Sequence, residues 1–177
     1  SVAAVAAGAG VPVADVESTF DALARRQAFL RTAPSVEWPD GTWSASFEFL
    51  HALYREVVGG QVTPGRRVEI HRAIGIRLEA AYGERAADVA LELSVHFEEA
   101  RDFDRAVRYL QHAAETARSR SAHDLARRQF ARALELLDRL PPGEARDERE
   151  MALQIGLGNV LMQATGWGAP GVAKTFA

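Results

Sequence analysis

The sequence predicts a mainly α-helical protein that contains one small β-hairpin. Two observations indicate this fold class. From residue 64 onward, apolar residues recur at helical spacing, with few interruptions. Between residues 42 and 49, by contrast, apolar and polar residues alternate, as they do in a half-buried strand. The chain has 177 residues, which is enough for one domain or two small ones.

Two helices are expected before the hairpin. Val2 to Ala7 forms a short helix that Gly8 and Gly10 stop. The second helix runs from about Val13 to Phe29, and Pro12 in its first turn costs little because the N–H that it lacks has no helical partner there. The buried stripe of this helix consists of Val16, Phe20, Leu23 and Ala24. A short helix, a glycine turn and a longer helix have the shape of a helix-turn-helix.

The hairpin follows directly. Trp38-Pro39-Asp40-Gly41 is a strong turn signal, because proline presets φ and glycine tolerates the exit from the turn. Leu30 to Glu37 is the expected partner strand. The expected buried face of the second strand carries Trp43, Ala45, Phe47 and Phe49. A helix-turn-helix followed by a hairpin predicts a winged helix over residues 1–62.

Residues 63–177 are expected to form a helical array. A helix from Leu50 to Val58 ends at Gly59-Gly60, and further helices are expected over 64–82, 85–100, 103–118, 121–139, 144–164 and 169–177. Large and small residues in this part match the tetratricopeptide pattern, with a plain helical bundle as the alternative. The residues of the first match are Leu93, Ser94, Phe97, Ala106, Leu110 and Ala113, and Ala126, Phe130 and Ala133 repeat its second half.

Charge and composition exclude several classes of protein. Residues 1–62 carry four arginines and seven acidic residues, and no segment has the basic excess that binding to a phosphate backbone requires. Asp15, Glu17 and Asp21 would also repel DNA from the second helix, so DNA binding is not expected. There are no cysteines, which fits a cytoplasmic location, and no apolar run is long enough for a membrane span.

No catalytic or metal site is expected. Gly168 to Thr175 is a near miss for a phosphate-binding loop, but Ala173 replaces a required glycine and no strand precedes it. Glu92, His96 and Glu99 share one helical face, yet they would need ligands from a second helix, and a solvated polar face is the simpler interpretation. No serine or threonine lies beside a base and an orienting acid.

His51 is the most specific candidate site residue. It lies where the hairpin passes into a helix, and an imidazole there can donate a hydrogen bond to a phosphate on a neighbouring domain. A structural histidine is the alternative. The segment Leu50-His51-Ala52-Leu53-Tyr54-Arg55-Glu56 resembles the end of the winged helix in STAND-class signal-transduction ATPases. Two further segments, 81–86 and 131–137, look like the helical region of predicted bacterial ATPases of this class.

The resemblance implies a role for each part of the chain. In that family the histidine contacts the β-phosphate of ADP and holds the closed state, a role that would fall on His51 with Arg55 nearby. Ala52 departs from the NB-ARC form, which has aspartate there. ATP or ADP with magnesium would bind an upstream nucleotide-binding domain, and this chain, read as an excised piece, would hold no cofactor. The helical array would bind a protein or small-molecule inducer. A stand-alone interaction module and a DNA-binding regulator remain alternatives.

Overall fold

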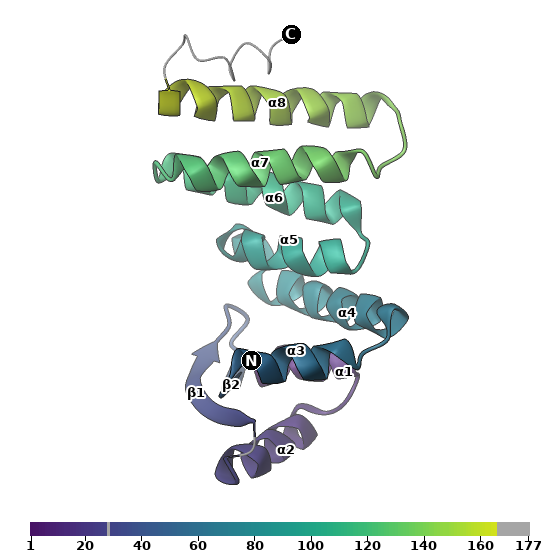
Figure 1. The fold of residues 1–177 in the computed structure, drawn as a ribbon, viewed down its shortest axis with the longest axis vertical. Helices are drawn as coiled ribbons and strands as arrows, with labels where there is room; N and C mark the ends of the chain where they lie inside the picture. Colours follow the sequence, from purple (N-terminus) through teal and green to yellow (C-terminus); the bar gives the residue numbers. More distant parts are fainter. Residues whose placement is uncertain (28, 166–177) are drawn as a thin grey trace. The chain divides into compact units, whose positions relative to one another are not determined.

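The computed structural model describes residues 1–27 and 29–165, and this part of the chain is mainly helical with one two-stranded antiparallel sheet (Figure 1). Its contacts divide the chain into two compact units, Ser1–Ala86 and Ala87–Ala177. The predicted domain boundary at residue 62 stays a prediction, because compact units need not coincide with domains. None of the helices in the described ranges combines the length and apolarity that crossing a membrane requires.

The first unit contains α1 (Val2–Ala9), α2 (Val13–Arg25), α3 (Ala52–Gly60) and α4 (Pro64–Tyr82) around the hairpin. α1 continues through Gly8 and ends at Gly10, whose left-handed φ of 72° caps it. The predicted stop at Gly8 was wrong because this glycine lies against α4. A Cβ there would be 3.0 Å from side-chain atoms of both Ile70 and Ile74, so the missing side chain lets the two helices approach closely.

α2 ends four residues earlier than the sequence predicts. Gln27 and Phe29 adopt positive φ angles of 50° and 71°, which break the helix before β1.

The small core of this unit forms where the helices meet the sheet. Val2, Ala6 and Val16 are buried, and Phe20, Ala45 and Phe47 pack against them. The rings of Phe20 and Phe47 meet edge to face at 5.5 Å between centroids.

The hairpin pairs β1 (Leu30–Glu37) with β2 (Trp43–Phe49). The expected buried face fails at both ends of the strand, because Trp43 is 67% exposed and Phe49 is 37% exposed. Ser44 is buried instead, and its hydroxyl accepts a hydrogen bond from the Ala3 N–H at 3.0 Å. The register of the hairpin explains part of the difference between the predicted and the observed buried face of β2. Ala33 pairs with Ser46 but Val36 with Ser44, so β1 carries an extra residue there, and such a bulge twists the end of the ribbon.

Arg77 of α4 holds the turn of the hairpin. Its guanidinium lies 4.7 Å from the centre of the Trp38 ring, and it donates hydrogen bonds to Asp40 at 2.9 Å and to Thr42 at 2.7 Å. Trp38 is only 5% exposed. The Thr42 N–H donates to the other oxygen of Asp40. One arginine therefore connects an aromatic ring, a carboxylate and a hydroxyl of a single turn to the neighbouring helix.

The second unit consists of helices that each pack on the next one along the chain (Figure 1). A 3-10 helix, η1 (Gly83–Val89), begins in the first unit and leads into α5 (Ala90–Glu99), where the sequence predicts one continuous helix over 85–100. The others are α6 (Phe103–Ser119), α7 (His123–Leu137) and α8 (Glu144–Thr165), close to their predicted ranges.

Arg132 of α7 connects two helices of this unit. It forms ion pairs with Glu98 of α5 and with Glu135 of its own helix. These partners raise the pKa of Arg132, and Glu98 contributes most to the increase.

Candidate functional site

His51 lies at the junction that the sequence indicates, between the end of β2 and the first residue of α3. Its backbone is extended, with φ −138° and ψ 143°, and its carbonyl accepts a hydrogen bond from the Tyr54 N–H at 3.1 Å. The residue is exposed, and its side chain does not cap the helix. Its ring lies 5.6 Å from the Tyr54 ring, measured between the two centroids. The imidazole is thus accessible to an external group.

Arg55 lies one helical turn beyond His51 and is exposed as well. None of the described residues forms an ion pair with it. Residues four apart lie on one side of a helix, so an imidazole and a guanidinium can reach the same side of α3. Together with the N–H groups of Ala52 and Leu53 at the start of α3, they provide hydrogen-bond donors and positive charge, which suit an anionic group.

Exposed apolar residues lie next to this junction and along α3. We call the set the α3 surface, and it comprises Phe29, Phe49, Leu50, Leu53, Val57 and Val58, whose exposed fractions range from 37% to 63%. No residue of α3 is buried, and the helix contacts β2 only slightly. A nine-residue helix has little stability by itself, so most of its stability must come from packing. A patch of this kind is typical of an interaction surface.

The residues of the predicted repeat pattern lie inside the second unit. Leu93, Phe97, Ala106, Ala126 and Ala133 have no exposed surface. Ser94, Leu110 and Phe130 are buried as well, and Ala113 is half-buried. The Phe97 ring stacks on Tyr109 with 5.7 Å between centroids. Small residues at 0% exposure allow the helix backbones to approach closely. The assignment to a tetratricopeptide-like repeat stays a prediction.

A groove between α5 and α7 was not foreseen from the sequence. It has a volume of about 360 Å³ and is lined by alanines of η1, α5 and α6 together with Leu91, Leu125 and Gln129. Leu91 and Val95 on α5 are 46% and 52% exposed. Arg77 with its three partners on the hairpin was also missed, since residues 35 to 39 positions apart give no local signal.

The acidic residues expected on α2 are at its surface. Asp15 and Glu17 are exposed near the start of the helix, and Asp21 is half-buried. Arg25 and Arg26 are exposed at the other end. The absence of DNA binding stays a prediction, which rests on the repulsion between these carboxylates and phosphates.

The sequence also raised a possible metal-binding face on α5 and a near-miss phosphate-binding loop. Glu92 and Glu99 are exposed and His96 is half-buried, and no group of three metal-ligating side chains is present among the described residues. The near-miss phosphate loop, Gly168 to Thr175, and the helix predicted over 169–177 lie outside the described residues.

Comparisons with protein-family models, with curated proteins and with solved structures found no match to this chain.

Proposed function

We propose that this chain is the regulatory part of a STAND-class signal-transduction ATPase, with a winged helix over residues 1–62 and tetratricopeptide-like helices after it. The winged helix relays the nucleotide state, and the helices bind a protein or small-molecule inducer. One observation carries the proposal: His51 is exposed directly after a hairpin, at the start of a helix, within the exposed apolar α3 surface.

The proposed closed state buries the α3 surface against the nucleotide-binding domain of the same polypeptide. Apolar burial supplies most of the free energy of docking, since each buried aliphatic side chain contributes about 1.5–3 kcal/mol. The His51 imidazole then donates a hydrogen bond to a phosphate of ADP, and Arg55 adds positive charge. ATP or ADP with magnesium belongs to that domain, which holds the phosphates itself.

The hydrogen bond from His51 makes the docking depend on the nucleotide. A hydrogen bond to a charged group contributes about 1.5–3 kcal/mol. That free energy changes a closed-to-open equilibrium by about 10- to 100-fold. Such a bias is large enough to hold the switch closed with ADP bound and small enough for an inducer on the helices to reverse.

The test replaces His51 with alanine in the complete polypeptide. We expect ADP to dissociate about 10- to 100-fold faster from His51→Ala than from the unmodified protein, because the hydrogen bond to the phosphate is lost. Stopped-flow release of a fluorescent ADP analogue measures this rate. His112→Ala is the matched control, since His112 is an exposed histidine on α6, far along the chain from α3.

An equal release rate in His51→Ala and His112→Ala would refute the role of His51.

A simpler observation tests whether the chain belongs to a STAND-class ATPase at all. The reading frame upstream of Ser1 is expected to encode a phosphate-binding loop about 200–300 residues earlier, as typical domain sizes imply. A reading frame with no such loop in that region would exclude the proposal.

The α5–α7 groove favours a second candidate, a helical-repeat module that binds a protein without any nucleotide. Leu91 lines this groove and is 46% exposed, so a partner that covers it would gain free energy from apolar burial. In this case Leu91→Asp weakens binding of a protein that co-purifies with the full chain, whereas His51→Ala leaves it unchanged. Under the switch proposal both substitutions alter signalling, so the pair of variants separates the two candidates.

DNA binding is the least supported candidate. Residues 1–62 carry four arginines against seven acidic residues, and the acidic residues of α2 oppose contact with phosphates. Binding of duplex DNA by this chain that weakens steeply as the salt concentration rises would show that it is a DNA-binding protein.

A further inference from the structure

The helix α3, which begins directly after His51, has few features that stabilise a helix by itself. It has nine residues, and the His51 side chain does not cap it. It has no acidic residue in its first turn and no basic residue in its last turn to complement the helix dipole. Its last four residues, Val57 to Gly60, are two valines and two glycines, which are poor helix formers. Contacts with the rest of the first unit must therefore hold α3 in place.

A comparison with α1 shows how few these contacts are. α1 is shorter by one residue, yet four of its residues are buried: Val2, Ala3, Ala6 and Gly8. α3 has no buried residue, and Tyr54 is its only side chain that is even half-buried. The packing of α3 on its own unit thus depends on one side chain.

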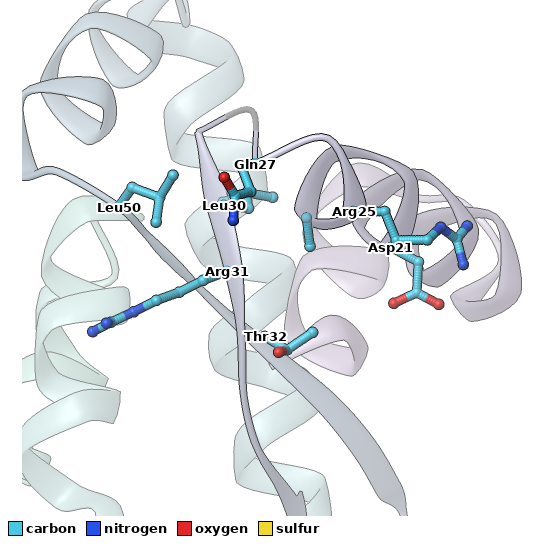
Figure 2. Close-up of a pocket in the computed structure, with 8 residues that line it drawn as sticks. Asp21, Arg25, Gln27, Leu30, Arg31, Thr32 and Leu50 are labelled. Carbon is cyan, nitrogen blue, oxygen red and sulfur yellow. The ribbon is translucent and has the colours of Figure 1, made fainter.

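Leu50, the last residue before His51, does not provide a second anchor. It is 38% exposed and lines a cavity of about 620 Å³ beside the start of β1. Figure 2 shows the Leu50 side chain apart from Asp21 and Arg25, which α2 contributes to the same cavity. The entry to α3 is therefore next to a cavity instead of a packed core.

The Tyr54 ring packs on Phe29, the residue before β1. The two centroids lie 5.0 Å apart and the ring planes meet at 88°, which is the edge-to-face arrangement that aromatic pairs prefer. Phe29 has a left-handed backbone with φ 71°, a conformation that a bulky residue rarely adopts. Its carbonyl accepts a hydrogen bond from the Leu50 N–H at 2.9 Å, so both ends of the hairpin fix its position.

The same tyrosine lies next to His51. The Tyr54 and His51 rings are 5.6 Å apart between centroids, and the Tyr54 N–H donates a hydrogen bond to the His51 carbonyl at 3.1 Å. The Tyr54 hydroxyl forms no hydrogen bond with a described residue, so the ring alone makes these contacts. Because Tyr54 contacts both Phe29 and His51, the place of the imidazole depends on that of the tyrosine ring.

We propose that Tyr54 is a positioning residue, whose contact with Phe29 holds α3 on the hairpin and thereby places the His51 imidazole. When this contact breaks, α3 unfolds locally while the rest of the first unit stays folded. The balance between these two states sets the fraction of molecules in which His51 is in place to meet a phosphate. The phosphate contact rests on the proposed function, whereas the effect of Tyr54 on α3 is a property of this chain and is tested in it.

Hydrogen exchange and NMR spectra of this chain test the proposal without any nucleotide. In the unmodified chain, the amides of residues 56–60 are expected to exchange with solvent faster than those of α1, which has buried residues. Tyr54→Ala should speed the exchange of the 56–60 amides about tenfold, because the aromatic contact is lost. It should also shift the ring protons of His51 toward their values in an unstructured peptide. Tyr54→Phe should preserve both properties, since the hydroxyl has no described partner.

Three further measurements show whether the effect belongs to this contact. Phe29→Ala should speed the exchange of the 56–60 amides as Tyr54→Ala does. The double variant should exchange no faster than either single variant, because all of them remove one contact. Tyr82→Ala is the matched control, since Tyr82 is a half-buried tyrosine at the end of α4 in the same unit, and it should leave α3 unchanged.

Two outcomes would overturn the proposal. The first is equal exchange of the 56–60 amides in Tyr54→Ala and Tyr82→Ala. The second is faster exchange of α1 together with α3 in Tyr54→Ala, which would show that the whole unit opens instead of α3 alone. In the complete polypeptide, Tyr54→Ala should also speed ADP release, and Tyr54→Phe should not. Faster exchange of α3 without faster ADP release would support the role of Tyr54 and refute the proposed contact of His51 with the nucleotide.

Discussion

Gly156 of α8 lies against the ring of Phe130 on α7, which leaves too little space for an added side chain unless the ring shifts. A Cβ at this position would be 2.6 Å from both Cε1 and Cζ of Phe130, which is itself 1% exposed. The ring cannot move away because it is closely packed. We predict that Gly156→Ala lowers the free energy of unfolding by about 1–3 kcal/mol, as overpacking of a core does. Urea unfolding followed by circular dichroism measures the change.

Gly65→Ala is the matched control for this prediction. Gly65 lies in the first turn of α4, and a Cβ there would have no heavy atom within 4 Å. The added methyl group should change stability by no more than about 0.5 kcal/mol. If both substitutions had the same effect, the close contact with Phe130 would not be the cause.

The Asp40 carboxyl makes the stability of the first unit depend on pH. Hydrogen bonds from the backbone and side chain of Thr42, and then Arg77, hold the pKa of the Asp40 carboxyl below its ordinary value of 3.8. A carboxyl whose pKa is lower in the folded state stabilises the fold above its unfolded pKa, and this contribution is lost as pH falls through the folded pKa. We therefore predict a loss of stability from Asp40 that begins near pH 4 and grows below it.

Asp40→Asn isolates this contribution. The difference in free energy of unfolding between the unmodified chain and Asp40→Asn should be constant above about pH 5 and should shrink below about pH 4. Urea unfolding at a series of pH values measures it. A difference that stays constant down to pH 2.5 would show that the carboxylate does not stabilise the turn.

At the scale of elements, the contact between α4 and the hairpin depends on Arg77. Arg77→Ala removes a cation–π contact of 4.7 Å, an ion pair with Asp40 and a hydrogen bond to Thr42. The side chains of Arg77 and Asp40 are about one-third exposed, which reduces each contribution. We predict a loss of about 1–2 kcal/mol in the free energy of unfolding.

Arg67→Ala is the control on the same helix. Arg67 is exposed and forms no ion pair with a described residue, so its removal should leave stability nearly unchanged. Thermal unfolding monitored by tryptophan fluorescence compares the two variants, because Trp38 lies beside Arg77. Equal midpoints for Arg77→Ala and Arg67→Ala would contradict the assigned role.

Local signals in the sequence predicted most elements but not their contacts. The helix predicted over 64–82 agrees with α4, because Thr63 caps it, Pro64 begins it and Gly83 ends it. The exposure of Trp43 and the burial of Ser44 could not be predicted, since alternation identifies two faces without showing what covers them. The continuation of α1 through Gly8 depends on Ile70 and Ile74, which are more than sixty positions away.

At the scale of the whole molecule, the sequence located the candidate site but not its surroundings. His51 and Arg55 were selected from one short segment, and the exposed ring agrees with a contact outside this chain. The α3 surface was not foreseen, because the apolar residues of a short amphipathic helix ordinarily indicate a buried stripe.

The α3 surface leads to a prediction that separates docking from folding. Leu53 is 63% exposed, whereas Leu78 of α4 is 3% exposed. In this chain, Leu53→Asp should change the free energy of unfolding by less than about 0.5 kcal/mol, while Leu78→Asp should cost more than about 3 kcal/mol. In the complete polypeptide, Leu53→Asp should nevertheless speed ADP release as His51→Ala does, because it weakens the same docked state. A large loss of stability from Leu53→Asp in this chain alone would instead place Leu53 in the core and leave α3 with no surface for docking.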